Sequence, residues 1–417
     1  MSVVTFDSSI SSNLTDTPAV ELSSFLSGAF GHLVTVGLFA TISHTETAGP
    51  AIFGFVDSTY FQIEGKVVAQ DGSALIADGN NNTVRIMGLG VMQASSGYAI
   101  DFGIDSNLSL DNTLINDGLI VGDVNFDWGD NVYNGQNGRM IGTIFMAGGA
   151  GSDDQVFGGA YTDRVHDSSR GSFGVSGDDT VVLGGGNDWY RYSSGNDHAD
   201  GGAGIDCFSA EFARAAMTID LSLGYGEAND GDLLEIIGFE HVTGSGFADT
   251  ITGSNTANII KGGFDNDTLN GLGGNDRIFG ESENDTINGG AGIDVMWGGA
   301  GRDVMTGGAG NDRFAFDDGD TGFAVGARDV IIDFVIGQDK INLRAMDGDI
   351  STPDPFDDQD FVFIGSALFG ANDPGKIRVT STGTTTFIGI NFDADASTDA
   401  FIQLNGVLAL TASDFIL

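Results

Sequence analysis

Disulfide bonds and basic surfaces are the first features that this sequence lacks. Cys207 is the only cysteine among 417 residues, so no intramolecular disulfide can staple the chain. Lysine and arginine together number 16, against 59 aspartate and glutamate residues. Nucleic acids and anionic membrane surfaces are bound through clustered basic side chains, so neither is an expected partner.

Catalytic motifs are equally scarce. The five histidines (His32, His44, His166, His198 and His241) stand far apart, so the zinc-binding pattern His-Glu-x-x-His is absent. The sequence also contains no Gly-x-Ser-x-Gly nucleophile elbow and no phosphate-binding Walker loop. Paired carboxylates are frequent, but 59 acidic residues produce such pairs by chance. The motifs therefore predict no catalytic residue and no organic cofactor.

Glycine and negative charge are abundant instead. The chain has 66 glycines, without the three-residue period of collagen, and a formal net charge of −43. Hydrophobic residues make up 41% of the chain, which is enough for a packed core and argues against disorder. Such a charge opposes compaction unless it is neutralised. Bound cations are the simplest compensation, and the alternative is a halophilic or merely soluble acidic surface.

A nine-residue register runs through the second half of the chain. An aspartate or asparagine recurs every nine residues, with a glycine five residues before it and an apolar residue two residues after it. Three positions hold this register over eight units, which chance does not produce. The acidic series is Asp249, Asn258, Asp267, Asp276, Asp285, Asp294, Asp303 and Asp312. The glycines run from Gly244 to Gly307, and the apolar residues from Ile251 to Phe314.

A shorter and less regular array precedes this one. Its acidic residues are Asp179, Asp188, Asp197 and Asp206, again nine apart, but Leu183 and Tyr192 stand where glycine is expected. Further upstream, "GGAGSDDQV" (148–156, with Asp153) and "GGAYTDRVH" (158–166) look like drifted units of the same kind.

The chemistry of one unit points to a metal. One apolar residue per nine suits a very short strand, which must stack on its neighbours as a solenoid to bury its side chain. Glycine permits left-handed turns and leaves backbone carbonyls exposed beside the aspartate. Hard oxygen ligands in a flexible loop suit Ca²⁺, which takes six to eight oxygens, better than Mg²⁺, which demands stricter octahedral geometry.

The units "GGAGIDVMW", "GGAGRDVMT" and "GGAGNDRFA" resemble the RTX (repeats-in-toxin) nonapeptide Gly-Gly-x-Gly-x-Asp-x-U-x, where U is apolar. The resemblance implies a parallel β-roll with two nonapeptides per coil and several calcium ions between turns 18 residues apart. Asp267, Asp285 and Asp303 then share one edge, and Asp276, Asp294 and Asp312 the other. The metal-site residues it implies are the aspartates of both arrays, including Asp153, with the turn glycines Gly271, Gly289, Gly298 and Gly307.

Three units depart from the motif. Asn258 replaces the aspartate of one unit, so its loop is expected to bind calcium weakly or not at all. The stretches "GFDNDTL" and "ESENDTI" place acids where glycine is expected. Those acids either add ligands or block the turn, and the sequence alone leaves both outcomes open.

The C-terminal hundred residues resemble the end of the serralysin metalloprotease C-terminal domain. The matching stretches are "DVIIDFVIGQDKINLRAMD" (329–347) and "FIQLNGVLALTASDFIL" (401–417). The resemblance implies a cap on the roll and an uncleaved type I secretion signal ending in Asp414-Phe415-Ile416-Leu417. A plain β cap is the alternative. The loop "NFDADASTD" (391–399) is either a further calcium loop or a solvated acidic turn.

The N-terminal part is less regular. Ala51, Ala74, Ala99 and Val124 begin similar segments 23 to 25 residues apart, a spacing that suits rungs of a parallel β-helix. An irregular β-sandwich is the alternative. The apolar stretch 25–42 is expected to form buried strands rather than a membrane span. A classical signal peptide is not expected, because the first basic residue is Lys66.

Together these observations predict an all-β parallel solenoid. We expect a β-helix-like region over 1–147, a first RTX array over 148–209, a β spacer over 210–243, a second array over 244–316, and a C-terminal cap over 317–417. The predicted function is a structural one: calcium-dependent self-association at the cell surface of a Gram-negative bacterium after export by a type I exporter. Cell-surface polysaccharide is a candidate partner. The alternative is a secreted polysaccharide lyase or epimerase with a β-helical catalytic part.

Overall fold

The computed structural model contains β-strands and almost no helix. It describes residues 2–6, 10–12, 20–21, 32–37, 40–44, 50–55, 58–70, 72–102, 111–126, 128–146, 152–167, 177–322, 324, 326–346, 361–370, 374–393 and 397–417. The chain forms two compact units, Met1–Phe212 with Gly231–Phe239, and Ala213–Asp230 with Glu240–Leu417. No helix in the described ranges is long and apolar enough to cross a membrane.

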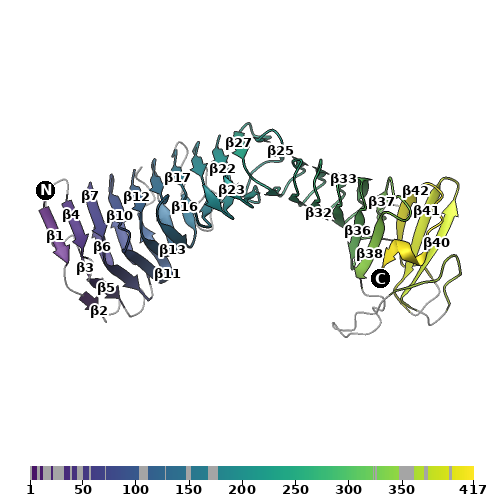
Figure 1. The fold of residues 1–417 in the computed structure, drawn as a ribbon, viewed down its shortest axis with the longest axis horizontal. Helices are drawn as coiled ribbons and strands as arrows, with labels where there is room; N and C mark the ends of the chain where they lie inside the picture. Colours follow the sequence, from purple (N-terminus) through teal and green to yellow (C-terminus); the bar gives the residue numbers. More distant parts are fainter. Residues whose placement is uncertain are drawn as a thin grey trace. The chain divides into compact units, whose positions relative to one another are not determined.

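The first unit begins as a parallel β-helix with three strands in each rung (Figure 1). Strands β1, β4 and β7 stack in parallel register, as do β2, β5 and β8, and β3, β6 and β9. The bounds are β1 (Ser2–Phe6), β2 (Ile10–Ser12), β3 (Val20–Glu21), β4 (His32–Val36), β5 (Thr41–His44), β6 (Ile52–Phe55), β7 (Thr59–Ile63), β8 (Lys66–Ala69) and β9 (Leu75–Asp78).

The next rungs continue the same stack with longer strands. Strand β11 pairs with β8 through its first half and with β9 through its second half, so one strand covers two sides of a rung. The bounds are β10 (Thr83–Ile86), β11 (Val91–Asp101), β12 (Thr113–Asn116), β13 (Leu119–Phe126), β14 (Val132–Asn134), β15 (Arg139–Ile141) and β16 (Ile144–Met146).

The β-helix predicted for the N-terminal region is confirmed. Ile52 pairs with Leu75, and Leu75 with Ile100, so the preceding Ala51, Ala74 and Ala99 occupy equivalent positions, all fully buried. Val124 is one residue out of this series, because it pairs with Ile100 itself. These continuous parallel ladders exclude the β-sandwich. In the stretch 25–42, β4 and the start of β5 are strands with buried Val34 and Val36, and residues 25–31 and 38–39 lie outside the described ranges.

The coils become shorter toward the end of the first unit. Each coil now has two main strands, and the interior side chains Val181, Tyr190, Ala199 and Phe208 are fully buried. The bounds are β17 (Gln155–Phe157), β18 (Arg164–His166), β19 (Thr180–Val182), β21 (Trp189–Arg191), β22 (His198–Asp200), β24 (Cys207–Ser209) and β27 (Leu233–Ile237), with the short pair β20 (Gly185–Gly186) and β23 (Ala203–Gly204).

The second unit opens with an antiparallel pair and then becomes a regular roll. Strands β25 (Met217–Asp220) and β26 (Tyr225–Ala228) run antiparallel, and β25 pairs in parallel with β29. One sheet of the roll holds β29 (Thr250–Thr252), β31 (Thr268–Asn270), β33 (Thr286–Ala291) and β35 (Val304–Ala309). The other holds β28 (His241–Thr243), β30 (Ile259–Gly263), β32 (Arg277–Ser282), β34 (Val295–Ala300) and β36 (Arg313–Asp317).

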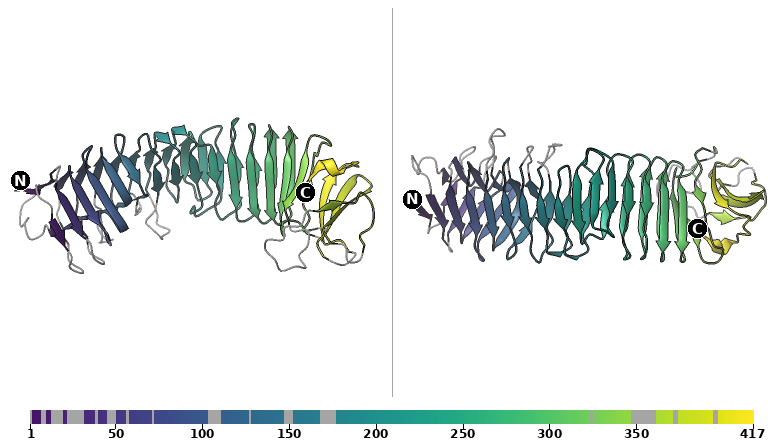
Figure 2. Two further views of the ribbon diagram at one scale, coloured as in Figure 1. Left: turned by 60° about the horizontal axis from the view of Figure 1, so that its bottom comes forward. Right: turned by 90° about the horizontal axis from the view of Figure 1, so that it is seen from above.

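The interior of the roll is a single row of apolar side chains from each sheet. These are the eight residues that follow the acidic series by two positions, and each is at most 1% exposed. Burying one such side chain contributes roughly 1.5–3 kcal/mol. In Figure 2 the strands of this roll, drawn in green, lie side by side along the chain. The hydrophobic register of the sequence therefore sets the register of the strands.

The C-terminal region continues the roll and then covers it. Strand β37 (Val330–Ile331) pairs with β35, and β38 (Lys340–Ala345) pairs with β36. An antiparallel meander of β40 (Lys376–Thr382), β41 (Thr385–Asn391) and β42 (Ala400–Asn405) joins β37 through β42, and β39 (Val362–Phe363) pairs with β40. The short 3₁₀ helix η2 (Ala412–Asp414) leads into β43 (Phe415–Ile416), which pairs with β38.

Candidate metal centre formed by aspartate ladders

Glycine shapes the turns at which successive coils stack. The second and fourth residues of a full motif, such as Gly290 and Gly292, have φ values of 103° and 145°, which favour glycine. A Cβ atom at Gly292 would lie 1.4 Å from the carbonyl oxygen of Gly274 in the preceding coil. The turn carbonyls therefore pack directly under the next turn, with no room for a side chain between them.

The acids that replace these glycines do not block the turn. Asp265, Glu281 and Glu283 also adopt a left-handed backbone, but with φ values of 70°, 80° and 73°, below those of the glycines at these positions. The Asp265 amide N–H donates to Glu283 Oε2 at 3.0 Å, one coil further on. A non-glycine residue in this conformation costs roughly 1 kcal/mol. Three further carboxylates are therefore held at the turns of one edge, at some cost to the backbone.

The motif aspartates form a ladder along this edge of the roll. The amide N–H of each one donates to Oδ1 of the aspartate 18 residues later. Asp249, Asp267, Asp285 and Asp303 are joined in this way by three bonds of 2.8 Å each. All four side chains are at most 2% exposed. The structure thus stacks the carboxylates in one column, as the 18-residue spacing predicts.

A second ladder follows the opposite edge. Asn258, Asp276, Asp294 and Asp312 are joined by bonds of 2.7, 2.8 and 3.0 Å from the amide N–H of one to Oδ1 of the next. Asn258 occupies its place in the column without a charge. Its Nδ2 donates to the Glu240 carbonyl at 2.8 Å, a bond that an aspartate cannot make.

The surroundings of the second carboxylate oxygen, Oδ2, show whether these aspartates could bind a cation. Oδ2 of Asp267, Asp276, Asp285, Asp294, Asp303 and Asp312 is buried and accepts no hydrogen bond from the described residues. A Cβ atom on the first glycine of the same motif would meet this oxygen, at 2.1 Å for Gly280 and Asp285 and at 2.4 Å for Gly271 and Asp276. Buried, unpartnered carboxylate oxygens beside bare glycine backbone are the donor set that Ca²⁺ requires.

Without a cation, the electrostatics of the ladders are unfavourable. Burial raises the pKa of Asp285 to about 8 and those of Asp267 and Asp276 to about 7, and neighbouring carboxylates of the same ladder add to each increase. Two charges about 4.8 Å apart, the strand spacing, repel by roughly 3 kcal/mol at an effective dielectric constant of about 20. A column of ionised aspartates therefore needs either protons or metal ions.

The first unit carries a matching pair of ladders. Asp179 N–H donates to Asp197 Oδ1 at 2.9 Å, and Asp188 N–H to Asp206 Oδ1 at 2.7 Å. Asp188 Oδ2 is buried without a hydrogen-bond partner in the described ranges. Burial also raises the pKa of Asp188, to about 7. The four aspartates of the shorter array therefore occupy positions equivalent to those of the longer one.

One sequence-predicted residue lies outside the ladder. Asp154, not Asp153, holds the ladder position, because β17 begins at Gln155 and pairs it with Thr180. Asp154 N–H donates to Asp179 Oδ1 at 2.8 Å, and Asp154 is 2% exposed. Asp153 is exposed and belongs to an outer row, where it accepts from Asp178 N–H at 3.0 Å. Residues 148–151 of this unit lie outside the described ranges.

A buried carboxylate cluster sits beside this ladder. Ligand oxygens of Asp167, Asp179 and Asp197 lie within 4.8 Å of one another, and all three residues are buried. Asp167 Oδ2 accepts from Ser193 N–H at 2.7 Å, and Tyr190 donates its hydroxyl to Asp197 Oδ2 at 2.5 Å. Sequence reasoning missed Asp167 because it lies outside the nine-residue register.

Upstream, the same column continues with asparagine in place of aspartate. Thr59 N–H donates to Asn82 Oδ1, Asn82 N–H to Asn112 Oδ1, Asn112 N–H to Asn131 Oδ1, and Asn131 N–H to Asp154 Oδ1, at 2.7–3.0 Å. The amide nitrogens are used as well, since Asn82 Nδ2 donates to Gly79 O at 2.9 Å and Asn131 Nδ2 to Gly129 O at 2.8 Å. Sequence reasoning missed this ladder because its rungs vary in length.

Downstream, each ladder of the second unit ends on an aspartate outside the motif. Asp303 N–H donates to Asp329 Oδ1 at 2.8 Å, and Asp312 N–H to Asp339 Oδ1 at 3.0 Å. Both acceptors belong to the C-terminal region, 26 and 27 residues further along the chain. In the 391–399 loop, Asp399 Oδ2 accepts from Phe392 N–H at 2.7 Å, and residues 394–396 lie outside the described ranges.

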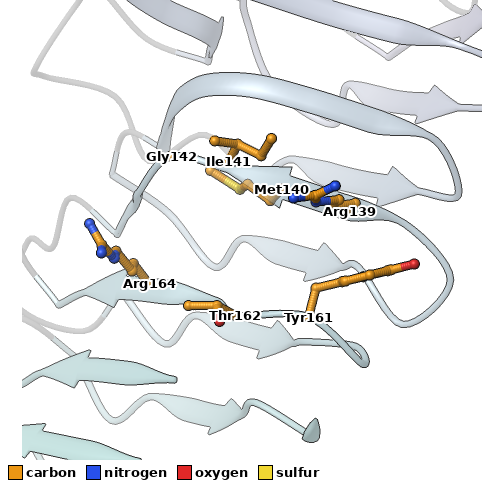
Figure 3. A pocket seen from close by; sticks show the side chains of 7 residues that line it. All are labelled: Arg139, Met140, Ile141, Gly142, Tyr161, Thr162 and Arg164. Carbon is orange, nitrogen blue, oxygen red and sulfur yellow. The ribbon is translucent and has the colours of Figure 1, made fainter. Parts of the chain in front are cut away.

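An open pocket of about 330 Å³ lies on the first unit. Its lining residues are Arg139, Met140, Ile141, Gly142, Tyr161, Thr162 and Arg164. Figure 3 shows Tyr161 beside Arg139 at one end of the pocket and Arg164 at the other. The Arg139 guanidinium lies 5.5 Å from the centre of the Tyr161 ring. The lining carries two positive charges and no carboxylate.

A comparison with protein families identifies the repeats. Residues 243–278 and 279–314 each match the family model of the RTX calcium-binding nonapeptide repeat, which spans four copies. The second unit therefore contains RTX repeats, and Ca²⁺ is the ion that these repeats bind. The matched residues are the ones whose aspartates form the two ladders. No curated protein matches the chain.

Solved structures give only partial likenesses. Two repeat subunits of a mannuronan C5-epimerase from Azotobacter vinelandii, R3 and R2, are 25% and 26% identical over 41% and 42% of this chain, covering 78% and 91% of their own, with TM-scores of 0.24 and 0.25. An extracellular lipase from Serratia marcescens is 13% identical over 70% of this chain and 45% of its own, with a TM-score of 0.21. At these TM-scores no activity is carried over to this chain.

Proposed function

We propose that this chain is a secreted structural protein whose RTX roll folds when it meets calcium outside the cell. The observation that carries the proposal is the row of buried, unpartnered aspartate oxygens on both edges of the roll. The ligands proposed for the ions are the ladder aspartates of both units and the carbonyls of their glycine turns, and several ions bind along each edge.

The same geometry explains why folding would wait for export. In a cytosol with little free calcium, stacked carboxylates repel, and the coils stay unfolded. Outside, binding energy becomes folding energy, because the site exists only when two coils are stacked. Extracellular calcium modules have dissociation constants of about 10⁻⁴–10⁻³ M, which suits this switch. An unfolded chain suits passage through a type I exporter, for which the C-terminal residues 414–417 are the proposed signal.

A calcium titration of the full chain tests this proposal. Far-UV circular dichroism should show little β-structure from the roll in excess chelator and a cooperative gain at submillimolar to millimolar calcium. Magnesium at the same concentration should produce a much smaller gain, because Mg²⁺ demands a regular octahedral arrangement of ligands that these turn oxygens do not offer. A β-spectrum that is already complete in chelator would contradict the proposal.

The structural role that we propose is calcium-dependent self-association through the N-terminal rungs. Within the described residues, β1 pairs with β4 alone, which leaves one edge of the strand open. Open strand edges are natural points of contact between chains. The charge of −43 keeps chains apart until calcium neutralises part of it. An ordered surface layer, filament or adhesive matrix would follow from such contacts.

A second candidate function is attachment to an acidic polysaccharide, favoured by the pocket around Arg139 and Arg164. Neither arginine forms an ion pair within the described residues, although acidic groups outnumber basic ones throughout the chain. Tyr161, 51% exposed, offers a ring on which a sugar can stack. Since no carboxylate lines the pocket, we assign it binding rather than catalysis. Retention on immobilised uronic-acid polymers, lost in R139A/R164A, would support attachment, and turnover of the polymer would favour the lyase or epimerase.

A further inference from the structure

The outer face of one sheet of the roll is basic and aromatic, although the chain as a whole is acidic. Strands β30, β32, β34 and β36 pair in this order, and the residues that flank each buried interior residue belong to the outer face. None of these flanking residues is acidic, and three are basic. They are Ile259, Lys261, Arg277, Phe279, Val295, Trp297, Arg313 and Ala315. Strands β29, β31, β33 and β35 of the opposite sheet contain no lysine or arginine.

The two arginines of this face are not neutralised by the chain itself. Arg277 and Arg313 are exposed and form no ion pair within the part of the chain that the structure describes. The Arg277 guanidinium lies 5.8 Å from the centre of the Phe279 ring and 5.4 Å from that of Trp297, and these rings stack on each other at 4.5 Å. A guanidinium positioned by aromatic rings keeps its N–H groups for a carboxylate. Arg277 is therefore held in place and can still bind an acid.

The third cation of the face is only loosely paired. Lys261 Nζ lies 3.7 Å from Glu281 Oε1, and 45% and 43% of the two side chains are exposed. Exposed pairs of this kind contribute little to stability. Lys261 can therefore exchange this partner for another carboxylate at small cost.

The edge of the roll at which these four strands end carries the opposite charge. Its turns expose Asp265 after β30, Glu283 after β32 and Asp318 after β36. The turn after β34 carries Arg302 instead. These exposed carboxylates are separate from the buried ladder aspartates of the same edge, so they are available to a partner outside the roll.

The charges of the face and of the edge follow the same order along the roll, whose coils are about 4.8 Å apart. Counted from the coil of β30, the first, second and fourth coils carry a cation on the face and a carboxylate on the edge. The third coil carries Trp297 on the face and Arg302 on the edge. The cations are Lys261, Arg277 and Arg313, and the carboxylates are Asp265, Glu283 and Asp318. The two surfaces are thus complementary when two rolls lie parallel and without an axial shift.

Other alignments of the two surfaces bring like charges together. Reversing one roll places Arg302 opposite Arg277, and a shift by one coil places it opposite Arg277 or Arg313. Like charges in opposition cost free energy and exclude such pairings. In the unshifted parallel alignment Arg302 meets Trp297, and an indole ring attracts a guanidinium.

From this match we infer that the outer face of β30, β32, β34 and β36 binds the acidic edge of a second copy of this chain, with the two rolls parallel and unshifted. Because face and edge are different surfaces, each copy can bind one neighbour through each of them, and copies add side by side. The inference rests on the proposed calcium-dependent folding of the roll, and it adds a lateral contact to the one proposed for the N-terminal rungs. Since exposed ion pairs are individually weak, the row of charges fixes the register more than the affinity.

Charge reversal in the full-length protein at millimolar calcium tests this contact. R277E/R313E makes the face acidic, and D265K/E283K makes the edge basic. Each variant alone should need an about tenfold higher protein concentration to assemble side by side, because its face and edge then carry charges of the same sign. An equimolar mixture of the two should assemble again, since each variant keeps the surface that complements the other. Sedimentation velocity and electron microscopy measure the assembly.

The same two variants separate the contact from an effect of net charge. R277E/R313E makes the chain more acidic and D265K/E283K makes it less acidic, so net charge alone predicts opposite effects, whereas the contact predicts a loss in both. Unchanged assembly of either variant, or a mixture that does not recover, overturns the inference. So does an R277E/R313E variant that assembles normally and instead loses retention on an immobilised uronic-acid polymer.

Circular dichroism with calcium shows whether each variant folds. If a reversed variant does not fold, R277Q/R313Q and D265N/E283Q replace the pair, and assembly equal to that of the natural chain contradicts the contact. A natural chain that folds with calcium and stays monomeric overturns the inference and leaves calcium-dependent folding intact. A natural chain whose roll does not respond to calcium would refute the proposed function instead.

Discussion

At the scale of single residues, the difference between aspartate and asparagine decides whether the second side-chain atom at a ladder position finds a hydrogen-bond partner in the protein. Both residues accept the same hydrogen bond through Oδ1: Asp276 accepts from Asn258 N–H, and Asn112 accepts from Asn82 N–H. The second atom differs, because the asparagine amide donates to a carbonyl whereas the aspartate oxygen remains without a donor. An asparagine thus completes its turn with protein atoms alone, whereas the second oxygen of the motif aspartates from Asp267 to Asp312 has no donor among the described residues.

Asp294→Ala should therefore reduce calcium binding more than Asn258→Ala. The first change removes a charged oxygen pair from a full motif, and we expect a loss of about one ion per chain and at least a tenfold weaker neighbouring site. The second change removes a neutral side chain that already has its own partner, so the number of ions should stay the same. Calorimetric titration with calcium measures both variants, and equal losses would refute the assignment of Asp294.

The first glycine of each motif should be needed for the room it leaves. In Gly280→Ala the new Cβ would lie 2.1 Å from Asp285 Oδ2 and 2.4 Å from the Gly298 carbonyl. The carboxylate must move, so we expect weaker calcium binding and a loss of about 1–3 kcal/mol in stability. Gly246→Ala is the matched control, because a Cβ there meets no atom within 4 Å. Chemical denaturation in calcium compares the two, and equal losses would argue against a tight turn.

The sequence predicts residues well where they obey the nine-residue register. The motif aspartates and the apolar residues after them lie where the spacing places them, on two edges and in the interior. Asp167, Asp329 and Asp339 were not predicted, because no fixed spacing links them to the repeats and only folding brings them to the ladders. In the unit 148–156 the motif Gly-Gly-x-Gly-x-Asp predicts Asp153, but the strand begins one residue later than the motif implies, so Asp154 occupies the ladder.

At the scale of elements, the asparagine ladder and the aspartate ladders mark parts of the solenoid that differ in whether their turns depend on a cation. From Thr59 to Asn131 the column consists of neutral side chains, and the amide groups of Asn82 and Asn131 donate to carbonyls of their own turns. From Asp154 onward the column is acidic. The rungs over 59–146 can therefore hold their turns together without a cation.

We expect the N-terminal rungs to keep their structure when calcium is removed. In chelator, amides of residues 59–146 should remain protected from hydrogen exchange, while those of residues 250–309 should exchange rapidly. The reason is that the first set stacks through neutral asparagines and the second through unpaired carboxylates. Mass spectrometry of the full chain, with calcium present as the reference, makes the comparison. Simultaneous loss of protection in both regions would show that the ladders do not differ in this way.

Protonation of the ladder aspartates at low pH should stabilise the calcium-free roll and so substitute in part for bound calcium. In the calcium-free roll, burial raises the pKa values of Asp267, Asp276 and Asp285 to about 7–8, whereas an unfolded aspartate titrates near 3.9. The folded roll therefore holds more protons between these values, so its stability is fully present below about pH 4 and is lost as the pH rises toward about 8. Calcium binding has the opposite dependence, because the ion needs the ionised carboxylates.

Circular dichroism in calcium-free buffer at several pH values tests this sign. The β-signal of the roll should increase on acidification from about pH 8 to about pH 5, and added calcium should have its largest effect at the alkaline end of this range. D285N is the control, since an amide in place of this carboxyl should reduce the pH dependence. A roll that loses structure on mild acidification without calcium would contradict the prediction.

The strand pairing of the regular roll could be predicted from the sequence, whereas for the β-helix only the fold type could be predicted and not the limits of its rungs. Nine-residue units give strands at a fixed spacing, so the parallel pairing of β29, β31 and β33 follows from counting. In the N-terminal region successive ladder residues are 23, 30, 19, 23 and 25 apart, which hides the repeat. The antiparallel meander of β40, β41 and β42 has no periodic signal, because tertiary pairing decides its register.

At the scale of the whole molecule, the charge of −43 and the calcium sites act against each other. Like charges on separate chains repel and keep them dispersed. Each bound Ca²⁺ removes two negative charges, and folding of the roll also fixes where the remaining ones lie. If calcium folds the roll as we propose, it lowers the electrostatic barrier to association at the same concentration at which it completes the fold.

We expect the full chain to self-associate in millimolar calcium, with contacts made through its N-terminal rungs. Strands β1, β2 and β3 each have one partner strand in the described ranges, so their second edges are open to another chain. Light scattering should show a calcium-dependent increase in mass, and electron microscopy should show ordered assemblies. A variant lacking residues 1–50 should bind calcium normally and assemble less, because it lacks the first rungs. Chelator should dissolve the assemblies of the full chain. If both forms stay monomeric at high concentration in calcium, the structural role is lost and the polysaccharide-directed alternative gains weight. If both assemble equally, the contact lies elsewhere on the solenoid.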